Sequence, residues 1–276
     1  MLGYQHAYHA GNMADVIKHM TLSYILDYLV KKDKPLFYLD THAGRGVYRF
    51  DDKESQKTKE YLSGIHQVYQ QKDKCHPFLN TYFDVIDALN RSDALEYYPG
   101  SPYFAYHYLR KTDRMIFADK HPHEFRKLSD NPLFHHKKIQ CLQTDGLSLL
   151  KSHLPPIEKR GLIVIDPSYE LKEDYYNVPK MLKEAYQRFR QGIYFVWYPI
   201  LKSEKHHDIL KKKLSQLPFE STVTIELTYP IEGVRGMEGC RIWIANPPYT
   251  LTEWFKKRVS PFVASSCFTH IKLSIE

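Results

Sequence analysis

The sequence predicts an α/β fold built on a doubly wound, mostly parallel sheet of seven strands. Short apolar runs alternate with helical patterns, which is typical of a parallel sheet covered by helices. Three runs end in an aspartate, at Asp40, Asp119 and Asp166. Ligands bind outside the carboxyl ends of such strands, so these residues are expected at the binding edge. The predicted strands are Leu36–Asp40, Met115–Asp119, Ile139–Leu142, Gly161–Asp166, Ile193–Tyr198, Thr222–Leu227 and Cys240–Ala245.

An amphipathic helix is predicted before the first strand. Asn12 is a good N-cap, with Asp15 three residues later, and apolar residues then recur at helical spacing as far as Tyr28. Lys18 and His19 interrupt the pattern. From the helix alone, we expect one of them to be solvated and the other half-buried.

The stretch from Val47 to Pro99 interrupts the alternation of strands and helices. It begins with the charged run Asp51–Glu54 and then shows helical periodicity, first from Tyr61 to Val68 and again from Phe78 to Leu89. We therefore predict one domain made of residues 1–46 and 100–276, with residues 47–99 forming a helical insert subdomain.

The last two predicted strands are expected to be antiparallel. The segment Thr228–Gly239 that joins them contains Pro230 and three glycines, so it is a poor candidate for a crossover helix. Helical patterns at Pro179–Phe189 and Ser203–Leu214 lie between the preceding strands.

Composition favours a polyanionic partner. The 276-residue chain has a net charge of +7 and a pI near 9.0, and phosphate contacts supply most non-specific nucleic-acid affinity. Its 22 Tyr and 14 Phe offer rings for base stacking, although core packing is the commoner use of such rings. No apolar run reaches the roughly 20 residues of a membrane span, and the N-terminus lacks a signal-peptide pattern. We expect a cytoplasmic protein without membrane contact.

The spacing of histidines and cysteines argues against a metal site. The pairs His135-His136 and His206-His207 lack the H-E-x-x-H spacing, and the four cysteines form no C-x-x-C pair. We expect no metal and interpret the cysteines as buried thiols.

Three loops after predicted strands have residues suited to a nucleoside cofactor. Small residues around Gly44 let a ligand approach the backbone. Asp119 is placed to bind ribose hydroxyls. Asp145 and Gly146 follow the third strand, where an acid can accept a hydrogen bond from the adenine amine of the cofactor. Each acidic residue can also be a turn former, so only their joint occurrence indicates a site.

Asp166-Pro167-Ser168-Tyr169 resembles the [D/N]-P-P-[Y/F] motif of amino methyltransferases. An exocyclic adenine amine is a poor nucleophile because its lone pair is delocalised into the ring. The Asp166 carboxylate and the Pro167 carbonyl can accept its two N–H bonds and direct the lone pair at a methyl donor. Tyr169 can stack on an extruded base. Catalysis would then consist of positioning and electrostatic stabilisation.

Asn246-Pro247-Pro248-Tyr249 matches the literal motif better than Asp166–Tyr169. It follows the last predicted strand, whose antiparallel direction places its end at the opposite edge of the sheet. We therefore favour Asp166, at the end of the fourth strand, and interpret Asn246–Tyr249 as a strand-terminating turn before a helix at Thr250–Lys257.

Several segments together resemble the RlmJ family, bacterial 23S ribosomal RNA adenine-N6 methyltransferases with a Rossmann-like class I methyltransferase fold. The resemblance runs from Tyr4 to Asn246, nearly the whole chain. The segments that carry it are His6–Asn12, Asp15–His19, Leu39–Gly44, Tyr97–Pro102 and Gly161–Pro167.

The resemblance implies roles for particular residues. Asp166 would be the catalytic acceptor, and Tyr4 and Lys18 would lie near the RNA substrate. It also implies a helical insert after the first strand. Two positions depart from the family: Ser168 replaces the second proline, and Asp119 replaces a longer acid. Contacts with S-adenosylmethionine are implied for His19, His42, Ser101, Asp119, Asp145 and Gly146.

The leading hypothesis is a monomeric S-adenosylmethionine-dependent enzyme that methylates N6 of an adenine in 23S ribosomal RNA, either protein-free or early in assembly. A DNA adenine-N6 methyltransferase or a DNA-utilisation protein shares the motif chemistry. The third alternative is a nucleic-acid-binding protein that has lost catalysis, against which the combination of Asp119, Asp145 and Asp166 argues.

Overall fold

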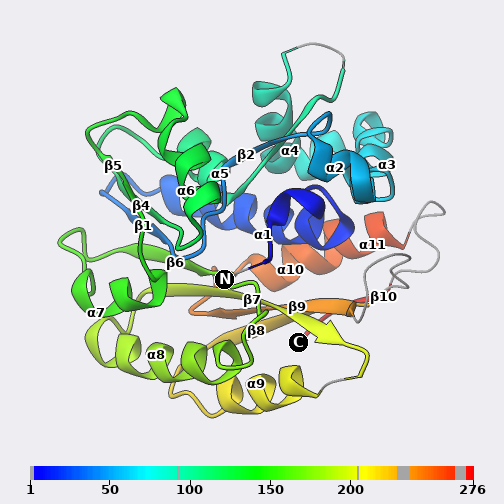
Figure 1. The fold of residues 1–276 in the computed structure, drawn as a ribbon. Coiled ribbons are helices and arrows are strands. Elements are labelled where there is room, and N and C mark those ends of the chain that lie inside the picture. The colour runs from blue at the N-terminus through cyan, green and yellow to red at the C-terminus, as the bar shows by residue number, and fades with distance from the viewer. Residues whose placement is uncertain (1–2, 92–93, 204, 229–236, 265–271) are drawn as a thin grey trace.

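The computed structural model describes residues 3–276 except 92–93, 204, 229–236 and 265–271. Its central sheet has eight strands in the order β10-β8-β9-β7-β6-β1-β4-β5 (Figure 1). The strands from β7 to β5 run parallel, β9 is antiparallel to both β7 and β8, and β10 is antiparallel to β8. The strands are β1 (Phe37–Asp40), β4 (Arg114–Ala118), β5 (Ile139–Leu142), β6 (Gly161–Ile165), β7 (Ile193–Leu201), β8 (Thr222–Thr228), β9 (Met237–Ala245) and β10 (Lys272–Ile275).

The predicted α/β fold, with its mostly parallel sheet and final antiparallel hairpin, is confirmed. The predicted number of strands is wrong, because β10 adds an eighth at the edge beside β8. Its residues alternate between exposed and half-buried, and only Leu273 and Ile275 are apolar. No apolar run therefore marks this strand in the sequence. The segment is a strand because it pairs with β8.

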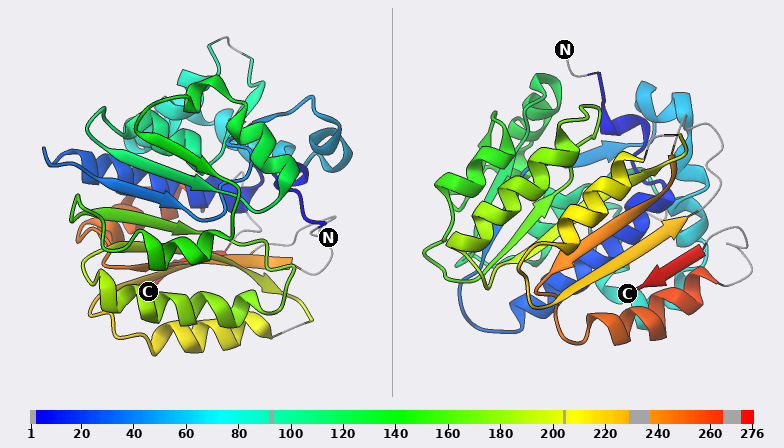
Figure 2. Two further views of the ribbon diagram at one scale, coloured as in Figure 1. Left: turned by 60° about the vertical axis from the view of Figure 1, so that its left-hand side comes forward. Right: turned by 90° about the horizontal axis from the view of Figure 1, so that it is seen from below.

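Helices cover both faces of the sheet (Figure 2). Leu39 and Ile163 pack on one face with α7, α8 and α9, whereas Tyr38 and Leu162 pack on the other with α1, α5 and α6. Successive residues of a strand point to opposite faces, which explains why these strands are apolar throughout. The helices are α1 (Met13–Val30), α5 (Ser101–Tyr108), α6 (Pro122–Ser129), α7 (Leu149–Ser152), α8 (Asp174–Arg188), α9 (His206–Ser215), α10 (Leu251–Trp254) and α11 (Ser260–Val263), with a π-helical turn η5 (Phe255–Val259) and the 3-10 turns η1 (His6–Tyr8), η3 (Pro132–Phe134) and η4 (Gly146–Ser148).

Helix α1 begins where the sequence predicts, since the Asn12 side chain accepts the Asp15 N–H at 3.0 Å. The predicted amphipathic character is wrong, because most of the helix is buried. Lys18 is 5% exposed and His19 is 1% exposed, so the expectation that one of the two is solvated is also wrong. The insert covers the side of α1 that faces away from the sheet (Figure 1), and a helix buried on all sides has no polar face.

Residues 47–99 leave the sheet after β1 and return before α5. The strands β2 and β3 form an antiparallel pair, so the first and last residues of this segment lie side by side. Helices occur near both predicted positions, while the two framing strands were not expected. The division of the chain at residues 46 and 99 stays a prediction. The elements are β2 (Val47–Arg49), α2 (Lys53–Thr58), η2 (Glu60–Leu62), α3 (Ile65–Tyr69), α4 (Lys72–Leu89) and β3 (Tyr97–Pro99).

The carboxyl ends of the parallel strands meet at one edge of the sheet. Asp40 ends β1, Asp119 follows β4 and Asp166 follows β6, as predicted. Strand β9 runs in the opposite direction, and Ala245 near its end pairs with Tyr194 near the start of β7. Asn246 therefore lies at the other edge.

Two further expectations concern membranes and cysteines. Among the described residues, no helix has the length and apolar character needed to cross a membrane. Cys240 is buried and Cys141 is half-buried, so the expected buried thiol is confirmed for Cys240 and wrong for Cys141. The side chain of Cys75 and the whole of Cys267 lie outside the described part of the chain.

Candidate active site

A pocket of about 380 Å³ lies at the carboxyl edge of the sheet. The N-terminal segment, α1, the start of α5 and the loops after β1, β4 and β6 form its walls. Its volume falls in the range of roughly 300–1,000 Å³ that is usual for small-molecule sites. The predicted residues that line it are Tyr4, Lys18, His19, His42, Gly44, Ser101, Asp119, Asp166, Pro167 and Tyr169.

The Asp166 carboxylate is held by a lysine from α1. Lys18 Nζ lies 2.7 Å from Asp166 Oδ2 and 2.8 Å from Asp15 Oδ1. Burial opposes the charge on Lys18, but the attraction of the two carboxylates outweighs it and raises the pKa of the lysine. Lys18 is therefore a charged ammonium that bridges two acids, and it binds one oxygen of Asp166, Oδ2.

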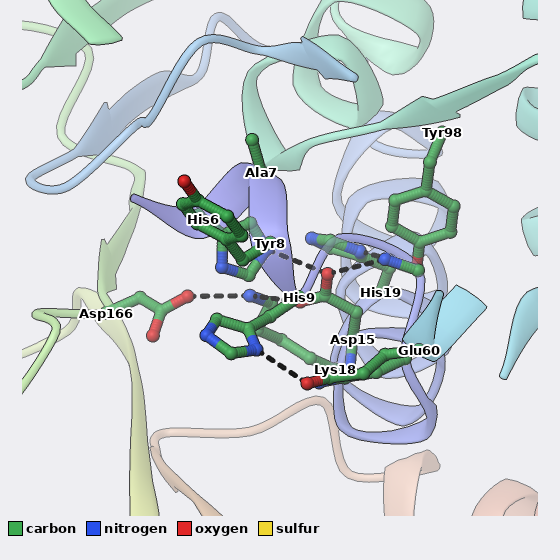
Figure 3. A network of polar contacts seen from close by, with 12 residues as sticks. His6, Ala7, Tyr8, His9, Asp15, Lys18, His19, Glu60, Tyr98 and Asp166 are labelled. Atoms are coloured by element: carbon green, nitrogen blue, oxygen red, sulfur yellow. Dashed lines mark hydrogen bonds and ion pairs between the residues drawn. The ribbon is translucent and has the colours of Figure 1, made fainter. Parts of the chain in front are cut away.

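Tyr4 and His6 extend this contact into a polar chain. The Tyr4 hydroxyl lies 3.0 Å from His6 Nδ1, and His6 Nε2 lies 2.8 Å from Asp15 Oδ2 (Figure 3 shows the His6 end). Although burial raises the pKa of Asp15, the charges of His6 and Lys18 hold it well below its usual range. Since an ionised carboxylate only accepts, His6 Nε2 carries the proton of its contact with Asp15, and the Tyr4 hydroxyl lies within hydrogen-bond distance of Nδ1.

His6 and Asp15 were not predicted as site residues. Both line the pocket, and Asp15 also accepts the Gly11 N–H at 3.0 Å. In the sequence, Asp15 resembles an ordinary helix-capping acid. Its contact with Lys18 at the i+3 position was the available signal, because residues three apart on a helix are neighbours.

Tyr169 lines the pocket, but its ring is largely covered. The side chain is 7% exposed and its ring centre lies 4.7 Å from that of Tyr175. The backbone at Tyr169 has φ +53°, a left-handed conformation that costs energy for a residue with a bulky side chain. The turn after Asp166 is therefore strained at the position predicted to stack on a base.

Trp197 is an aromatic wall that the sequence did not single out. It belongs to β7, is half-buried and lines the pocket. Lys18 Nζ lies 5.8 Å from the centre of its ring, within the range of a cation–π interaction. The surrounding run from Ile193 to Leu201 reads as a buried strand, so nothing local distinguishes Trp197 from a core residue.

The loops after β1 and β4 are joined through Asp119. Its carboxylate accepts the Gly44 N–H at 2.8 Å and the His121 N–H at 2.7 Å. Each carboxylate oxygen retains capacity for a further bond, so Asp119 can still bind hydroxyl groups in the pocket. Gly44 has φ +59°, and a Cβ there would lie 2.3 Å from the Tyr48 hydroxyl oxygen, which explains the need for glycine.

Two histidines in the pocket are neutral. Burial lowers the pKa of His42 to about 4. Burial and the charge of Lys18 together hold the pKa of His19 well below its usual value. His19 Nδ1 lies 2.9 Å from the Tyr98 hydroxyl, while its buried Nε2 has no partner among the described residues.

Asp40 lies beneath the pocket and is fully buried. Tyr38 donates to its Oδ2 at 3.2 Å, and the His42 N–H donates to its Oδ1 at 3.3 Å. Burial raises the pKa of Asp40 to about 7. Its carboxyl group organises the backbone at His42, which itself lines the pocket.

Asp145 and Gly146 are not among the residues that line the pocket. The exposed Asp145 side chain accepts the Leu147 N–H at 3.1 Å and caps η4. A Cβ at Gly146 would lie 1.9 Å from the Thr41 carbonyl oxygen. Glycine is thus required there for close packing against the loop after β1, and the cofactor contacts implied for both residues stay predictions.

Asn246 stabilises a turn away from the pocket. Its Nδ2 donates to the carbonyls of Arg190 and Gly192 at 2.7 and 2.8 Å. It has φ +52°, a conformation that asparagine tolerates better than most residues. These contacts agree with the strand-terminating turn expected at Asn246–Tyr249. Across the described residues, no group of three or more His, Cys, Asp or Glu side chains is arranged to hold a metal ion.

Comparisons with known proteins point to ribosomal RNA methyltransferases. The model of the family described as "Ribosomal RNA large subunit methyltransferase D, RlmJ" matches residues 33–271. The chain is 40% identical over 262 residues to ribosomal RNA large subunit methyltransferase J of Escherichia coli (strain K12), covering 92% of this chain and 90% of the relative. The enzyme of that name in Haemophilus influenzae is 40% identical over 268 residues, covering 96% and 94%.

A solved structure shares the whole architecture. Protein LPL1258 of Legionella pneumophila superimposes with a TM-score of 0.88 and 44% sequence identity, covering 97% of this chain and 98% of that protein. The resemblance found in the sequence is thereby confirmed, and the chain belongs to the RlmJ family of ribosomal RNA large subunit methyltransferases.

Proposed function

We propose that this protein transfers a methyl group from S-adenosylmethionine to N6 of an adenine in 23S ribosomal RNA, with Asp166 as the acceptor of the amine. The observation that carries the proposal is the Asp166 carboxylate, which Lys18 holds in the same pocket as Asp119. Family membership supports an S-adenosylmethionine-dependent methyltransferase that acts on ribosomal RNA. The choice of adenine N6 rests on the chemistry of the Asp166–Tyr169 turn.

The residues of the pocket suit S-adenosylmethionine. Asp119 offers carboxylate oxygens for ribose hydroxyls, beside a loop in which Gly44 brings backbone close to the ligand. The buried Nε2 of His19 and the neutral ring of His42 supply polar atoms without adding positive charge. This arrangement suits a cofactor that carries its own sulfonium charge. When bound, the cofactor supplies an activated methyl group.

The protein's contribution to transfer is to hold the amine. Lys18 binds Oδ2 of Asp166, which leaves Oδ1 to accept one amine N–H, while the Pro167 carbonyl accepts the other. Both bonds favour a pyramidal nitrogen whose lone pair is available for attack. Asp166 and the Pro167 carbonyl stabilise the positive charge that develops on that nitrogen.

Aromatic groups flank the position of the base. Trp197 and Tyr169 line the pocket on the sheet side, and Tyr4 lines it on the side of the N-terminal segment. Adenine has to leave its stack before its amine can reach Asp166, and aromatic rings offset the free energy of unstacking. We propose that Tyr4 and Lys18 lie next to the RNA substrate.

Tritiated S-adenosylmethionine and protein-free 23S ribosomal RNA test the proposal directly. The wild-type protein is expected to label the RNA in N6-methyladenosine, and Asp166→Ala is expected to abolish labelling. The matched control is Asn246→Ala, in the competing motif, which should label at the wild-type rate per folded molecule. Labelling of duplex DNA instead of RNA would establish the DNA alternative, and binding of RNA without labelling would establish the non-catalytic one.

A further inference from the structure

Two glutamates outside the predicted site hold the N-terminal segment, residues 3–12. Glu170 lies four residues after Asp166, and its two carboxylate oxygens each accept the Gly3 N–H at 3.0 Å. One of them also accepts the Tyr4 N–H at 3.2 Å. Glu170 therefore ties the beginning of this segment to the catalytic turn.

Glu60 holds the other end of the segment. It belongs to η2 of the insert, and its carboxylate oxygens lie 2.9 Å from His9 Nδ1 and 3.1 Å from Asn12 Nδ2. Both partners must donate because the carboxylate only accepts. Figure 3 shows the Glu60–His9 contact on one side of the polar network and Asp166 on the other.

Both contacts converge on Tyr4. Its backbone N–H is bound to Glu170, and its ring is stacked on His9, with ring centres 5.6 Å apart and planes inclined by 16°. The Tyr4 hydroxyl then contacts His6, at the start of the chain of contacts that reaches Lys18. Neither glutamate lines the pocket, so each acts on it through the N-terminal segment.

A chain terminus needs such contacts to be ordered. The segment has a single short helical turn, η1, and terminal residues are poorly ordered unless they are tied down. Hydrogen bonds to a carboxylate are about twice as strong as neutral ones. Each glutamate makes more than one of them, which is enough to offset part of the entropy lost when the segment is ordered.

We propose that Glu60 and Glu170 are positioning residues for methyl transfer, which together fix Tyr4 and His6 against the Lys18–Asp166 ion pair. This inference rests on the proposed function. It also gives residues 47–99 a part in catalysis, because Glu60 connects the insert to the pocket.

The test compares Glu60→Ala and Glu170→Ala with Glu60→Gln and Glu170→Gln. The matched control is Glu253→Ala, which removes an exposed glutamate whose ion-pair partner is Lys257 in the adjoining turn. Each alanine variant should lower kcat on 23S ribosomal RNA by roughly tenfold, equivalent to about 1.4 kcal/mol of transition-state free energy. Glu170→Gln should recover most of that loss, because one amide oxygen can accept both the Gly3 and the Tyr4 N–H as Oε2 does now. Glu60→Gln should recover only part of it, because its amide oxygen can replace one of the two accepting oxygens and its amide nitrogen cannot accept. The control should match wild type.

Hydrogen exchange of residues 3–12, measured by mass spectrometry, reports on the contacts without any substrate. Exchange should be faster in both alanine variants, with a midpoint of thermal unfolding within a few degrees of wild type. Unchanged kcat and unchanged exchange would overturn the inference. A loss of kcat that follows a loss of thermal stability, with no recovery in the glutamine variants, would show a merely structural role and also overturn it.

Failure of the proposed function has a different signature. In that case wild type would transfer no methyl group to RNA, whatever the state of the two glutamates. The inference is then tested without RNA, by hydrogen exchange of residues 3–12 and by the affinity for S-adenosylhomocysteine. Wild-type exchange and affinity in both alanine variants would reject it.

Discussion

Replacement of Lys18 by Met removes the cation that joins Asp15 to Asp166. Methionine keeps much of the length and apolar surface of the side chain, so the lost packing is small. The lost interactions are two charge-assisted contacts, at 2.8 and 2.7 Å, made by a lysine whose side chain is 6% exposed. Removal of one partner from a buried ion pair costs about 3–5 kcal/mol, because the remaining charge is left uncompensated.

The lower end of that range applies here. The Asp166 side chain is 16% exposed and faces a pocket that water can enter, so solvent screens part of its charge. Lys18→Met should therefore lower the free energy of unfolding by about 3 kcal/mol, measured by urea denaturation. Asp166 also loses the contact that orients it, and a misplaced reacting group costs on the order of 100-fold in rate. We expect kcat for methylation of 23S RNA to fall by that factor.

The double variant Asp15→Asn/Lys18→Met separates stability from orientation. It removes the buried charge of Asp15 along with the ammonium that neutralised it, so part of the lost stability should return. The rate should stay low, because Asp166 still lacks its partner. If Lys18→Met unfolds at the wild-type urea concentration and transfers methyl groups within about threefold of wild type, the assignment of Lys18 as the residue that orients Asp166 is refuted.

Three further predictions concern residues around the pocket and at the opposite edge of the sheet. Gly146→Ala places a Cβ 1.9 Å from the Thr41 carbonyl oxygen. It should lower the free energy of unfolding by about 1–3 kcal/mol and raise the KM for S-adenosylmethionine. An unchanged midpoint of thermal unfolding would contradict the close packing at Gly146. Burial raises the pKa of Asp40 to about 7 in the folded protein, against 3.8 for an unperturbed aspartate. Its burial therefore does not destabilise the protein below pH 4, destabilises it increasingly up to pH 7, and does so fully above that. Asp40→Asn should gain stability over wild type by up to about 4 kcal/mol between pH 4 and pH 8, and a constant difference across urea titrations at several pH values would show that Asp40 does not titrate in this way. Asn246→Ala loses two hydrogen bonds and keeps an unfavourable φ. It should therefore lower the free energy of unfolding by about 2 kcal/mol without changing kcat. A large loss of kcat would indicate that Asn246 is the catalytic residue.

Local sequence patterns were sufficient for the framework of the site. Apolar runs define the parallel strands, and the aspartates that end them are at one edge because parallel strands share their direction. The same argument separated Asp166 from Asn246, since β9 runs antiparallel to β7. These inferences require only the periodicity of short segments and the rules of sheet topology.

The polar network could not be obtained from sequence in this way. Lys18 and Asp166 are 148 residues apart, and nothing in either segment indicates that they pair. Glu60 and Glu170 resemble ordinary surface acids until the N-terminal segment is placed between them. The eighth strand, β10, exists only through its pairing with β8.

The sequence by itself determined the fold class, the direction of its strands and the chemical character of the Asp166 turn, because each follows from residues that are neighbours along the chain. The tertiary structure alone decided that α1 is buried on both sides and that its Lys18 holds the Asp166 carboxylate. That outcome depends on the insert, which packs over the side of α1 that faces away from the sheet, and a helix covered on both sides has no polar face.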